Sequence, residues 1–313
     1  MTTNQSKAVI ALASRLGDPN RPSLAPTRWN QLHSTLSDQG IDVASIFDDG
    51  FRADAVEGMM PEDAAAIDDL LHTAAAATIE ASELERHGIN VLTVLDDAYP
   101  QSLKTRLEAL APPVIFAVGN QDLLTGDGVG VVGSRDVDEP GQHAAEAVAR
   151  EAVNLGRTVV SGAARGVDSL AMAEAFASGG SVIGVLADSL KARIRKPDIL
   201  RALDEGRLCL ISQQHPSAGF TPASAMARNK LVYSLTDTTV VIATDLETGG
   251  TWSGATEAIT KRLCDVAVWI GEGAGPGNDS LVEQGGRAIG SVDQLLDGTP
   301  TEPVEQLSLT DLT

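Results

Sequence analysis

One stretch, residues 129–168, constrains the fold of this chain more than any other. An apolar run at 129–132 ends at a glycine, and residues 142–155 then follow with alanine-rich helical spacing and a glycine behind them. Residues 158–160 are β-branched, which is typical of a buried strand, and they end at a second glycine-rich loop. This order predicts one βαβ unit, whose right-handed crossover makes its two strands parallel.

Each of these strands ends in a loop of small residues that carries one arginine. The first loop, residues 133–135, contains Arg135, and the second, residues 161–166, contains Arg165. Ligands of open parallel sheets bind beyond the carboxyl ends of the strands, so we expect both arginines to face one crevice. Two arginines beside helix N-termini predict an anion site, most simply for phosphate.

The remaining sequence predicts an extended Rossmann-like α/β domain with a mainly parallel sheet, preceded by a small helical domain. Residues 1–86 have helical spacing, and 61–86 read as one long alanine-rich helix. Residues 87–118 predict a strand, a helix and a second strand that extend the main sheet. We therefore expect a helical domain at 1–86, the α/β domain at 87–290 and an acidic tail at 291–313, with a short helix at 292–296.

The charge of the chain is strongly negative but unevenly distributed. The 313 residues carry a formal net charge of −20, which argues against a broad basic surface for nucleic acid. Residues 129–290 hold 15 of the 23 basic and 19 of the 43 acidic residues, so they account for only −4. A confined basic groove within this region stays compatible with the composition.

Targeting signals and metal motifs are not recognisable. The N-terminus has no charged segment followed by a long apolar core, and no run approaches the ~18 apolar residues of a membrane span. Cys209 and Cys264 lie in apolar surroundings without metal-ligand spacing, as is typical of buried reduced thiols. These features predict a soluble, cytoplasmic protein without a metal.

Two further groups of basic residues stand out against the acidic background. The densest, Lys191, Arg193, Arg195 and Lys196, follows an expected strand and should rim the same crevice, although a charge run is usually a solvated face. Arg228 and Lys230 flank Asn229 in a segment expected to begin a helix. We expect the basic side chains to contact phosphates and Asn229 to bond loop backbone.

A glycine- and hydroxyl-rich segment, residues 247–257, follows the strand expected at 239–243. Glycines and hydroxyls that open a helix suit a phosphate or a nucleic-acid backbone. Trp252 either stacks on a base, a contact worth roughly 1–3 kcal/mol in single-strand binders, or packs the loop. The residue pattern leaves these two roles equal.

The sequence gives no support for dinucleotide or ATP chemistry. Gly128, Gly130 and Gly133 satisfy G-x-G-x-x-G, but the motif should follow a strand, whereas two of these glycines precede or lie inside one. No P-loop motif occurs, and no nucleophile–base pair is visible. His215 precedes a proline and reads as a turn residue. We therefore expect no catalytic residues and no cofactor.

The two glycine loops, GSR and SGAARGVD, resemble the signature loops of the DprA/Smf family of bacterial DNA-processing proteins, in which the second usually reads SGLARGID. Further matches occur in the same order: RNKLVYSLTD resembles RNRIIAGLSD, and TGGTWSGATEA resembles SGSL.TA..A. The segment at 87–119 resembles the family's pattern of D..YP..L followed by two prolines. The usual SE.P motif is absent, which marks a divergent member. The resemblance covers roughly residues 87–290.

This resemblance implies a protein that binds single-stranded DNA, protects it and assists RecA loading in transformation or recombination. It also implies a homodimer and no enzymatic activity. A winged helix often ends such proteins, and the 23 residues after position 290 are too few for one. The candidate nucleic-acid-binding residues are Gly133, Ser134, Arg135, Ser161, Gly162, Arg165, Gly166, Lys191, Arg193, Arg195, Lys196, Arg228, Asn229, Lys230, Gly249, Gly250, Thr251, Trp252 and Ser253.

Two rival functions use the same crevice. The lysine-decarboxylase-like (LOG) phosphoribohydrolases carry PGGxGTxxE, whose glutamate helps cleave nucleotide N-glycosidic bonds. Gly249, Gly250 and Glu257 approach that pattern, but the spacing is one residue too long and the proline is missing. A nucleotide-sensing module, for example in phage defence, would bind without catalysis.

Overall fold

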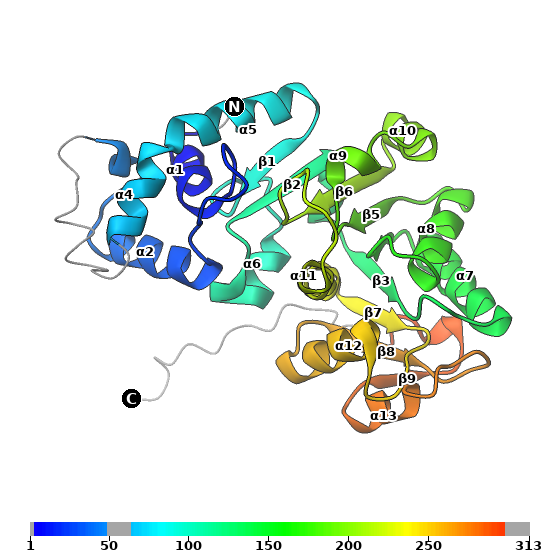
Figure 1. The fold of residues 1–313 in the computed structure, drawn as a ribbon. Helices are drawn as coiled ribbons and strands as arrows, with labels where there is room; N and C mark the ends of the chain where they lie inside the picture. The colour runs from blue at the N-terminus through cyan, green and yellow to red at the C-terminus, as the bar shows by residue number, and fades with distance from the viewer. Residues whose placement is uncertain (1–2, 49–63, 298–313) are drawn as a thin grey trace, which may run out of the picture.

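A computed structural model describes residues 3–48 and 64–297 of the chain (Figure 1). The expected helix start at residue 61 and the acidic tail from residue 298 lie outside the described residues. The first described elements are helical, as predicted: α1 (Asn4–Ala13), α2 (Pro26–Asp38), η1 (Val43–Phe47), α4 (Ala64–His72) and α5 (Ala74–Arg86). None of the described helices is long and apolar enough to cross a membrane.

The described residues form one nine-stranded sheet with the order β1-β2-β6-β5-β4-β3-β7-β8-β9. The strands from β6 to β9 in this order are all parallel, whereas β1 and β2 join one edge in antiparallel pairing. The mainly parallel, Rossmann-like sheet predicted from the sequence is confirmed. The strands are β1 (Asn90–Thr93), β2 (Val114–Gly119), β3 (Gly128–Val132), β4 (Thr158–Ser161), β5 (Val182–Val185), β6 (Leu208–Ser212), β7 (Thr238–Val241), β8 (Asp265–Trp269) and β9 (Arg287–Ile289).

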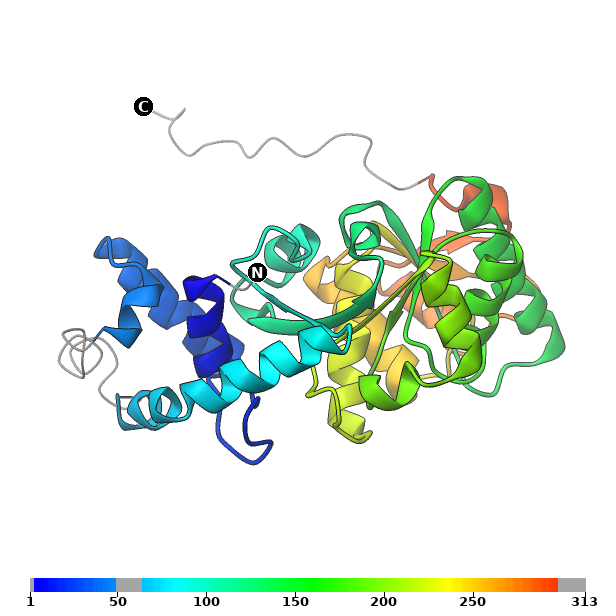
Figure 2. The same cartoon turned by 90° about the horizontal axis from the view of Figure 1, so that it is seen from above.

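Helices cover both faces of the sheet (Figures 1 and 2). One face packs against α7 (Glu139–Asn154), α8 (Val167–Ala177), α9 (Leu190–Arg193) and α10 (Pro197–Asp204), together with the N-terminal helices. The opposite face packs against α6 (Gln101–Leu107), α11 (Pro222–Ser234), α12 (Gly249–Lys261) and α13 (Asn278–Glu283). This three-layer arrangement explains why the strands are apolar on both sides.

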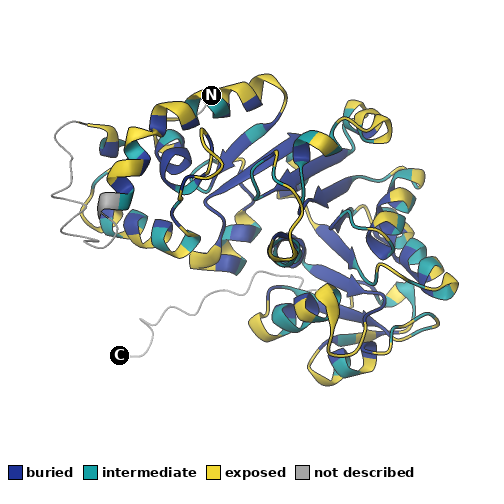
Figure 3. Cartoon of the chain, viewed as in Figure 1, coloured by how far each residue is buried: buried dark blue, intermediate teal, exposed yellow. Residues whose placement is uncertain are grey.

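Strand periodicity divides the interior into two hydrophobic clusters, one on each face of the sheet. In β7, Val240 belongs to the cluster under α7 and α8, and its neighbour Val241 belongs to the cluster under α11 and α12. Both are fully buried, since successive side chains of a strand point to opposite faces. Figure 3 shows the strands as a buried layer between exposed outer helix faces. Alternation therefore fills both cores with small β-branched residues.

The N-terminal helical segment shares a core with the sheet. Ala8 and Leu84 belong to the same buried cluster as Val91 of β1 and Phe116 of β2. A polar contact adds to it: Nε2 of His215 lies 3.2 Å from Oε1 of Glu80 in α5. The boundary expected at residue 86 stays a prediction, and buried contacts run across it.

The long helix expected to end at Arg86 is interrupted, so that prediction is wrong in detail. Thr73 separates α4 from α5, and its backbone leaves the helical region at ψ 3°. The Thr73 hydroxyl donates to the carbonyl of Leu70 (3.0 Å) and accepts from Nη1 of Arg21 (2.7 Å). Side-chain bonding of this kind competes with the helical ladder, which accounts for the break.

The first part of the expected acidic tail packs onto the α/β domain. Residues Val292–Gln294 form the 3₁₀ turn η4, and Leu295 behind it is fully buried. The Arg287 guanidinium donates to the carbonyls of Gln294 (2.8 Å) and Leu295 (3.0 Å). The last strand and the following turn are thus fixed to each other.

The chain reverses its direction of growth across the sheet between β3 and β7. From β3 it proceeds to β4, β5 and β6, and the crossover through α11 then places β7 on the other side of β3. The helices that follow these two strands, α7 and α12, lie on opposite faces. Such a switch point opens a crevice at the carboxyl ends of the strands.

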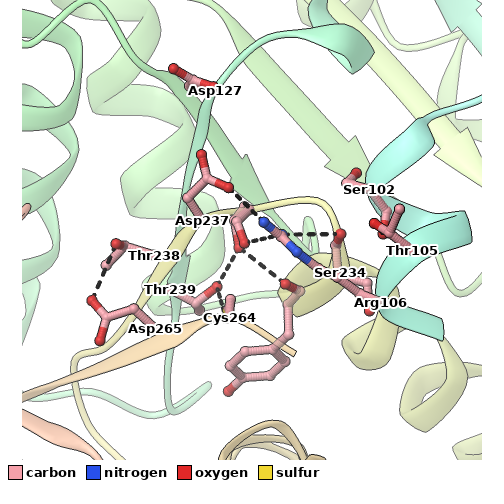
Figure 4. A network of polar contacts seen from close by, with 12 residues as sticks. Ser102, Thr105, Arg106, Asp127, Ser234, Asp237, Thr238, Thr239, Cys264 and Asp265 are labelled. Carbon is pink, nitrogen blue, oxygen red and sulfur yellow. Dashed lines mark hydrogen bonds and ion pairs between the residues drawn. The ribbon is translucent and has the colours of Figure 1, made fainter. Parts of the chain in front are cut away.

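At the opposite, amino-terminal end of β7, Arg106 of α6 ties together three segments (Figure 4). Its Nη2 lies 2.5 Å from Oδ1 of Asp237, and its Nη1 donates to the carbonyls of Ser234 (3.3 Å) and Thr236. The guanidinium thereby satisfies carbonyls at the end of α11, where the helix leaves them without intrahelical partners. It fixes the junction between α11 and β7.

We predict that Arg106→Ala lowers the free energy of unfolding by about 1.5–3 kcal/mol, because it leaves the carbonyls of Ser234 and Thr236 without their charged donor. Urea unfolding followed by circular dichroism measures this change. Arg86→Ala is the control, since Arg86 is largely exposed and 4.0 Å from Glu83; we expect it to stay within about 0.5 kcal/mol of the wild type. Equal effects of the two substitutions would contradict the structural role of Arg106.

Candidate functional site

A cavity of about 500 Å³ occupies the crevice at the switch point. The loops after β3, β4 and β7 form its walls, together with α11 and the N-terminus of α12. The loops that carry Arg135 and Arg165 are neighbours, as the sequence predicted. Of the candidate binding residues, Gly133, Ser134, Arg135, Gly162, Arg228, Asn229, Gly249, Gly250 and Thr251 line this cavity.

The two glycine loops touch through their backbones. Val167 N–H donates to the carbonyl of Ser134 (3.2 Å), and Ser134 N–H donates to the carbonyl of Ala243 after β7 (2.8 Å). Gly166 has φ +81°, and a Cβ there would lie 2.4 Å from the Ser134 carbonyl oxygen. Glycine is therefore required at this position by close packing as well as by backbone conformation.

Arg228 lies beneath the loops and does not reach freely into the crevice. The segment expected to begin a helix at Arg228 instead lies in the middle of α11, which starts at Pro222, so that expectation is wrong. Arg228 is only 6% exposed; its Nη1 donates to the Gly162 carbonyl and lies 3.4 Å from Oδ2 of Asp168. Burial raises the pKa of Asp168, and the nearby Arg228 guanidinium partly offsets this.

The glycine-rich segment opens a helix, as predicted, and forms the first turn of α12. The helix already begins at Gly249, and its N-cap Thr248 makes no side-chain cap hydrogen bond. The Thr251 hydroxyl donates to the Gly133 carbonyl (3.0 Å), and Asn229 Nδ2 donates to the Gly250 carbonyl (3.0 Å). The turn is thus fixed to the β3 loop and to α11, and the Asn229 contact matches its predicted bond to backbone.

Trp252 takes the packing role of the two considered. It is half-buried against the cluster under α11 and α12, and it is not among the described residues that line the cavity. Ser161 and Ser253 also bond within the fold: their hydroxyls donate to the carbonyls of Val131 (2.7 Å) and Gly249 (3.0 Å).

A second hollow of about 390 Å³ adjoins the cavity and is lined by four arginines. Phe220 borders both hollows and is 54% exposed. The Arg135 guanidinium lies over its ring, 5.7 Å from the centroid, which is cation–π geometry. Phe220 is not among the site residues predicted from the sequence; its one signal is an aromatic residue between small residues in the segment that precedes α11. The four arginines are Arg135, Arg165, Arg193 and Arg228.

Most basic side chains near the crevice have a carboxylate partner. Arg165 pairs with Asp136 (2.9 Å) on the exposed rim, and Arg193 pairs with Asp188 (3.4 Å). Arg135 forms no ion pair with any described residue. Lys191, Arg195 and Lys196 lie on or just after α9 and line neither hollow, although they surround Arg193 in the sequence.

Glu257, the residue considered for glycosidic hydrolysis, does not line the cavity formed by the described residues. It lies 2.9 Å from Nζ of Lys230 and 2.6 Å from Nζ of Lys261. These lysines outweigh the opposing effect of burial and hold its pKa below the usual range. Glu257 is therefore an ionised carboxylate, and Lys230 forms an ion pair with it.

No group of three or more His, Cys, Asp or Glu among the described residues could hold a metal ion. The cysteines are free; burial raises the pKa of Cys209 to about 12 and that of Cys264 to about 11. Such thiols are poor nucleophiles and poor metal ligands at neutral pH.

A mostly parallel sheet covered on both faces, with arginines and a helix N-terminus in a crevice at its switch point, defines a Rossmann-like α/β protein. Residues 90–300 match the family model of DNA recombination-mediator protein A. The chain therefore belongs to that family, as the DprA/Smf resemblance of its loops predicted.

Two curated relatives support this membership. DNA processing protein DprA from Bacillus subtilis (strain 168) is 25% identical over 222 residues, which cover 70% of this chain and 74% of the relative. DNA processing protein DprA from Streptococcus pneumoniae (strain ATCC BAA-255 / R6) is 28% identical over 211 residues, which cover 65% and 72%.

Two solved structures share the fold. The X-ray structure of DprA from Streptococcus pneumoniae superposes with a TM-score of 0.71 at 22% identity, covering 96% of this chain and 99% of that one. A structure of DprA from Helicobacter pylori, described for its single-stranded DNA binding mode, gives a TM-score of 0.54 at 23% identity, covering 67% and 94%.

We predict that Gly166→Ala destabilises the protein by at least about 2 kcal/mol more than Gly179→Ala, because only the first pushes a methyl group into packed backbone. Both glycines have φ +81°, but a Cβ at Gly179 meets nothing within 4 Å. Gly166 also has ψ −134°, outside the left-handed helical region, so the expected difference combines this backbone cost for alanine with the packing clash. Urea unfolding of the two variants tests this. Equal losses in the free energy of unfolding would contradict the prediction, because the loops would then accommodate the added methyl group.

Proposed function

We propose that this chain binds single-stranded DNA in the crevice and acts as a recombination mediator of the DNA-processing type. One observation carries the proposal: two adjoining hollows at the switch point share the Arg135–Phe220 pair as their common wall. A cation held against an exposed aromatic ring offers a phosphate contact and a stacking surface side by side. The family membership supports the same function, as does the Helicobacter pylori relative whose structure is described for single-stranded DNA binding.

The arginine-lined hollow is the part of the crevice suited to phosphates. Arg135 and Arg165 reach it from two loops and Arg193 from the end of α9, and the Lys191–Lys196 cluster extends the positive surface beyond it. Binding to phosphates releases counterions and reads no sequence, so affinity depends steeply on salt. A guanidinium has five N–H donors, so Arg165 and Arg193 can contact phosphates in this mode while they keep their Asp partners.

Phe220 is the stacking surface in this proposal, whereas for Trp252 the sequence left stacking and packing equally open. Its ring is more than half exposed, and Arg135 covers it only in part. Base–aromatic stacking is tolerant of sequence because every base has a π-face. The site needs no nucleophile, metal or cofactor for this function.

We further propose that the chain works as a homodimer in the cytoplasm and that it delivers single strands to a RecA-type recombinase during recombination or transformation. These features rest on the family relationship. Size-exclusion chromatography with light scattering tests the dimer, and strand exchange with RecA in the presence of a single-strand binding protein tests the delivery.

The central experiment measures binding of a fluorescent ~30-nucleotide single strand across a salt series. We predict that wild-type binding weakens with salt and that Arg165→Glu binds at least about tenfold more weakly, with a salt slope reduced by roughly 0.7 for each lost phosphate contact. Arg165 is suitable because its side chain is 72% exposed, so the variant keeps its fold. Arg228 is unsuitable, since its burial makes every substitution a test of folding.

Arg86→Glu is the matched control, because it makes the same charge reversal on an exposed residue at the end of α5. We expect it to change affinity less than about twofold. No wild-type binding at low salt would overturn the proposal. Binding of a mononucleotide in its place would favour the nucleotide-sensing function.

A further inference from the structure

The two hollows of the crevice differ in charge. Arg135 and Arg228 line both of them. Apart from these shared residues, the smaller hollow is lined by two further cations, Arg165 and Arg193, and by one carboxylate, that of Asp188. The larger cavity is lined by no further cation among the described residues and by three carboxylates, those of Asp136, Asp168 and Asp245. A phosphate backbone is favoured in the smaller hollow and repelled from the larger one.

Asp245 is the carboxylate of this cavity that stays available to a ligand. Asp136 is paired with Arg165, and Asp168 is paired with Arg228. Asp245 is exposed in the loop after β7, and no described residue forms an ion pair with it. It is therefore an acceptor at the cavity mouth without a competing intramolecular donor.

Two residues of the cavity wall each carry a buried polar atom that has no hydrogen-bond partner among the described residues. The Tyr233 hydroxyl and Nε of Arg228 are both unpaired, and their side chains are only 2% and 6% exposed. Both residues line the cavity. Buried polar groups without partners are rare because each costs stability, but both atoms are themselves buried, so a ligand in the cavity does not reach them in this structure.

We propose that the larger cavity receives a nucleobase of the bound strand and that Asp245 selects bases with an exocyclic amino group. The inference rests on the proposed function and deepens it. The smaller hollow holds the phosphate backbone. The base stacks on Phe220, which borders both hollows, and its edge enters the larger cavity. There the carboxylate of Asp245 accepts a hydrogen bond from the amino group.

The chemistry of the base edges makes this a choice between bases. Cytosine and adenine present an amino donor beside an acceptor nitrogen, whereas thymine presents a carbonyl oxygen at the corresponding position. A carboxylate accepts from the amino group and repels the carbonyl oxygen, so the same side chain attracts one class and rejects the other. Stacking on Phe220 does not distinguish them, because both classes have a π-face.

Strands of deoxycytidine and of deoxyuridine test this directly, because the two bases differ only at the edge that Asp245 would read. We predict that the wild type binds a ~30-nucleotide deoxycytidine strand at least about fivefold more tightly than the deoxyuridine strand, measured by fluorescence anisotropy at one salt concentration and pH 8. In Asp245→Asn we expect the ratio of the two dissociation constants to fall within about twofold of one, since an amide offers both a donor and an acceptor.

Asp204→Asn is the control, because it removes the same charge from an exposed aspartate at the end of α10, outside both hollows. It should leave the ratio at its wild-type value. Equal binding of both strands by the wild type would overturn the inference while leaving single-strand binding intact. An unchanged ratio in Asp245→Asn would also overturn it, because the carboxylate would then repel both strands equally and take no part in choosing the base. Binding of neither strand would instead overturn the proposed function.

Discussion

The buried ion pair between Arg228 and Asp168 is the interaction on which the crevice depends. It joins α11, the start of α8 and the loop after β4, and both side chains are 6% exposed. A guanidinium removed from water needs partners around it, and here the Gly162 carbonyl and the Asp168 carboxylate supply them. A Cβ at position 162 would lie 1.6 Å from Nη1 of Arg228. That glycine is therefore fixed by the arginine beneath it, and the loop it shapes presents Arg165 on the rim.

Local charge, and not net charge, decides what this acidic protein can bind. Screening confines the effect of exposed charges to about 10 Å at ordinary ionic strength. Arg135 from the loop after β3 and Arg193 from the end of α9 line one hollow, while much of the −20 resides in flanking segments. A strand held there experiences the arginines far more than the distant carboxylates. The surrounding negative surface still has an effect, because it limits non-specific binding of polyanions elsewhere.

The fold was more predictable from sequence than the site, for a physical reason. Strand and helix patterns such as those of β3, α7 and β4 repeat with short periods, so nearby residues reveal them. The pairing of Arg228 with Asp168 spans 60 positions and depends on how α11 packs over the sheet. The local sequence shows a basic residue at both positions, so it does not reveal that Arg228 is buried and Arg165 exposed. Phe220 escaped notice for the same reason, since its partner Arg135 is remote in sequence.

In the binding mode that we propose, a carboxylate in the crevice lowers the affinity for nucleic acid. Asp245 repels the phosphates of any strand, so it lowers affinity for every sequence alike. Whether it can accept a hydrogen bond depends on the base. Specificity is set by the difference between the affinities for two bases, so a side chain that lowers both affinities can still raise specificity. The arginine-lined hollow next to it supplies attraction without selection. In the binding mode that we propose, separating the two on either side of Phe220 lets one part of the crevice hold the backbone while the other distinguishes bases, a division that a uniformly basic groove does not provide.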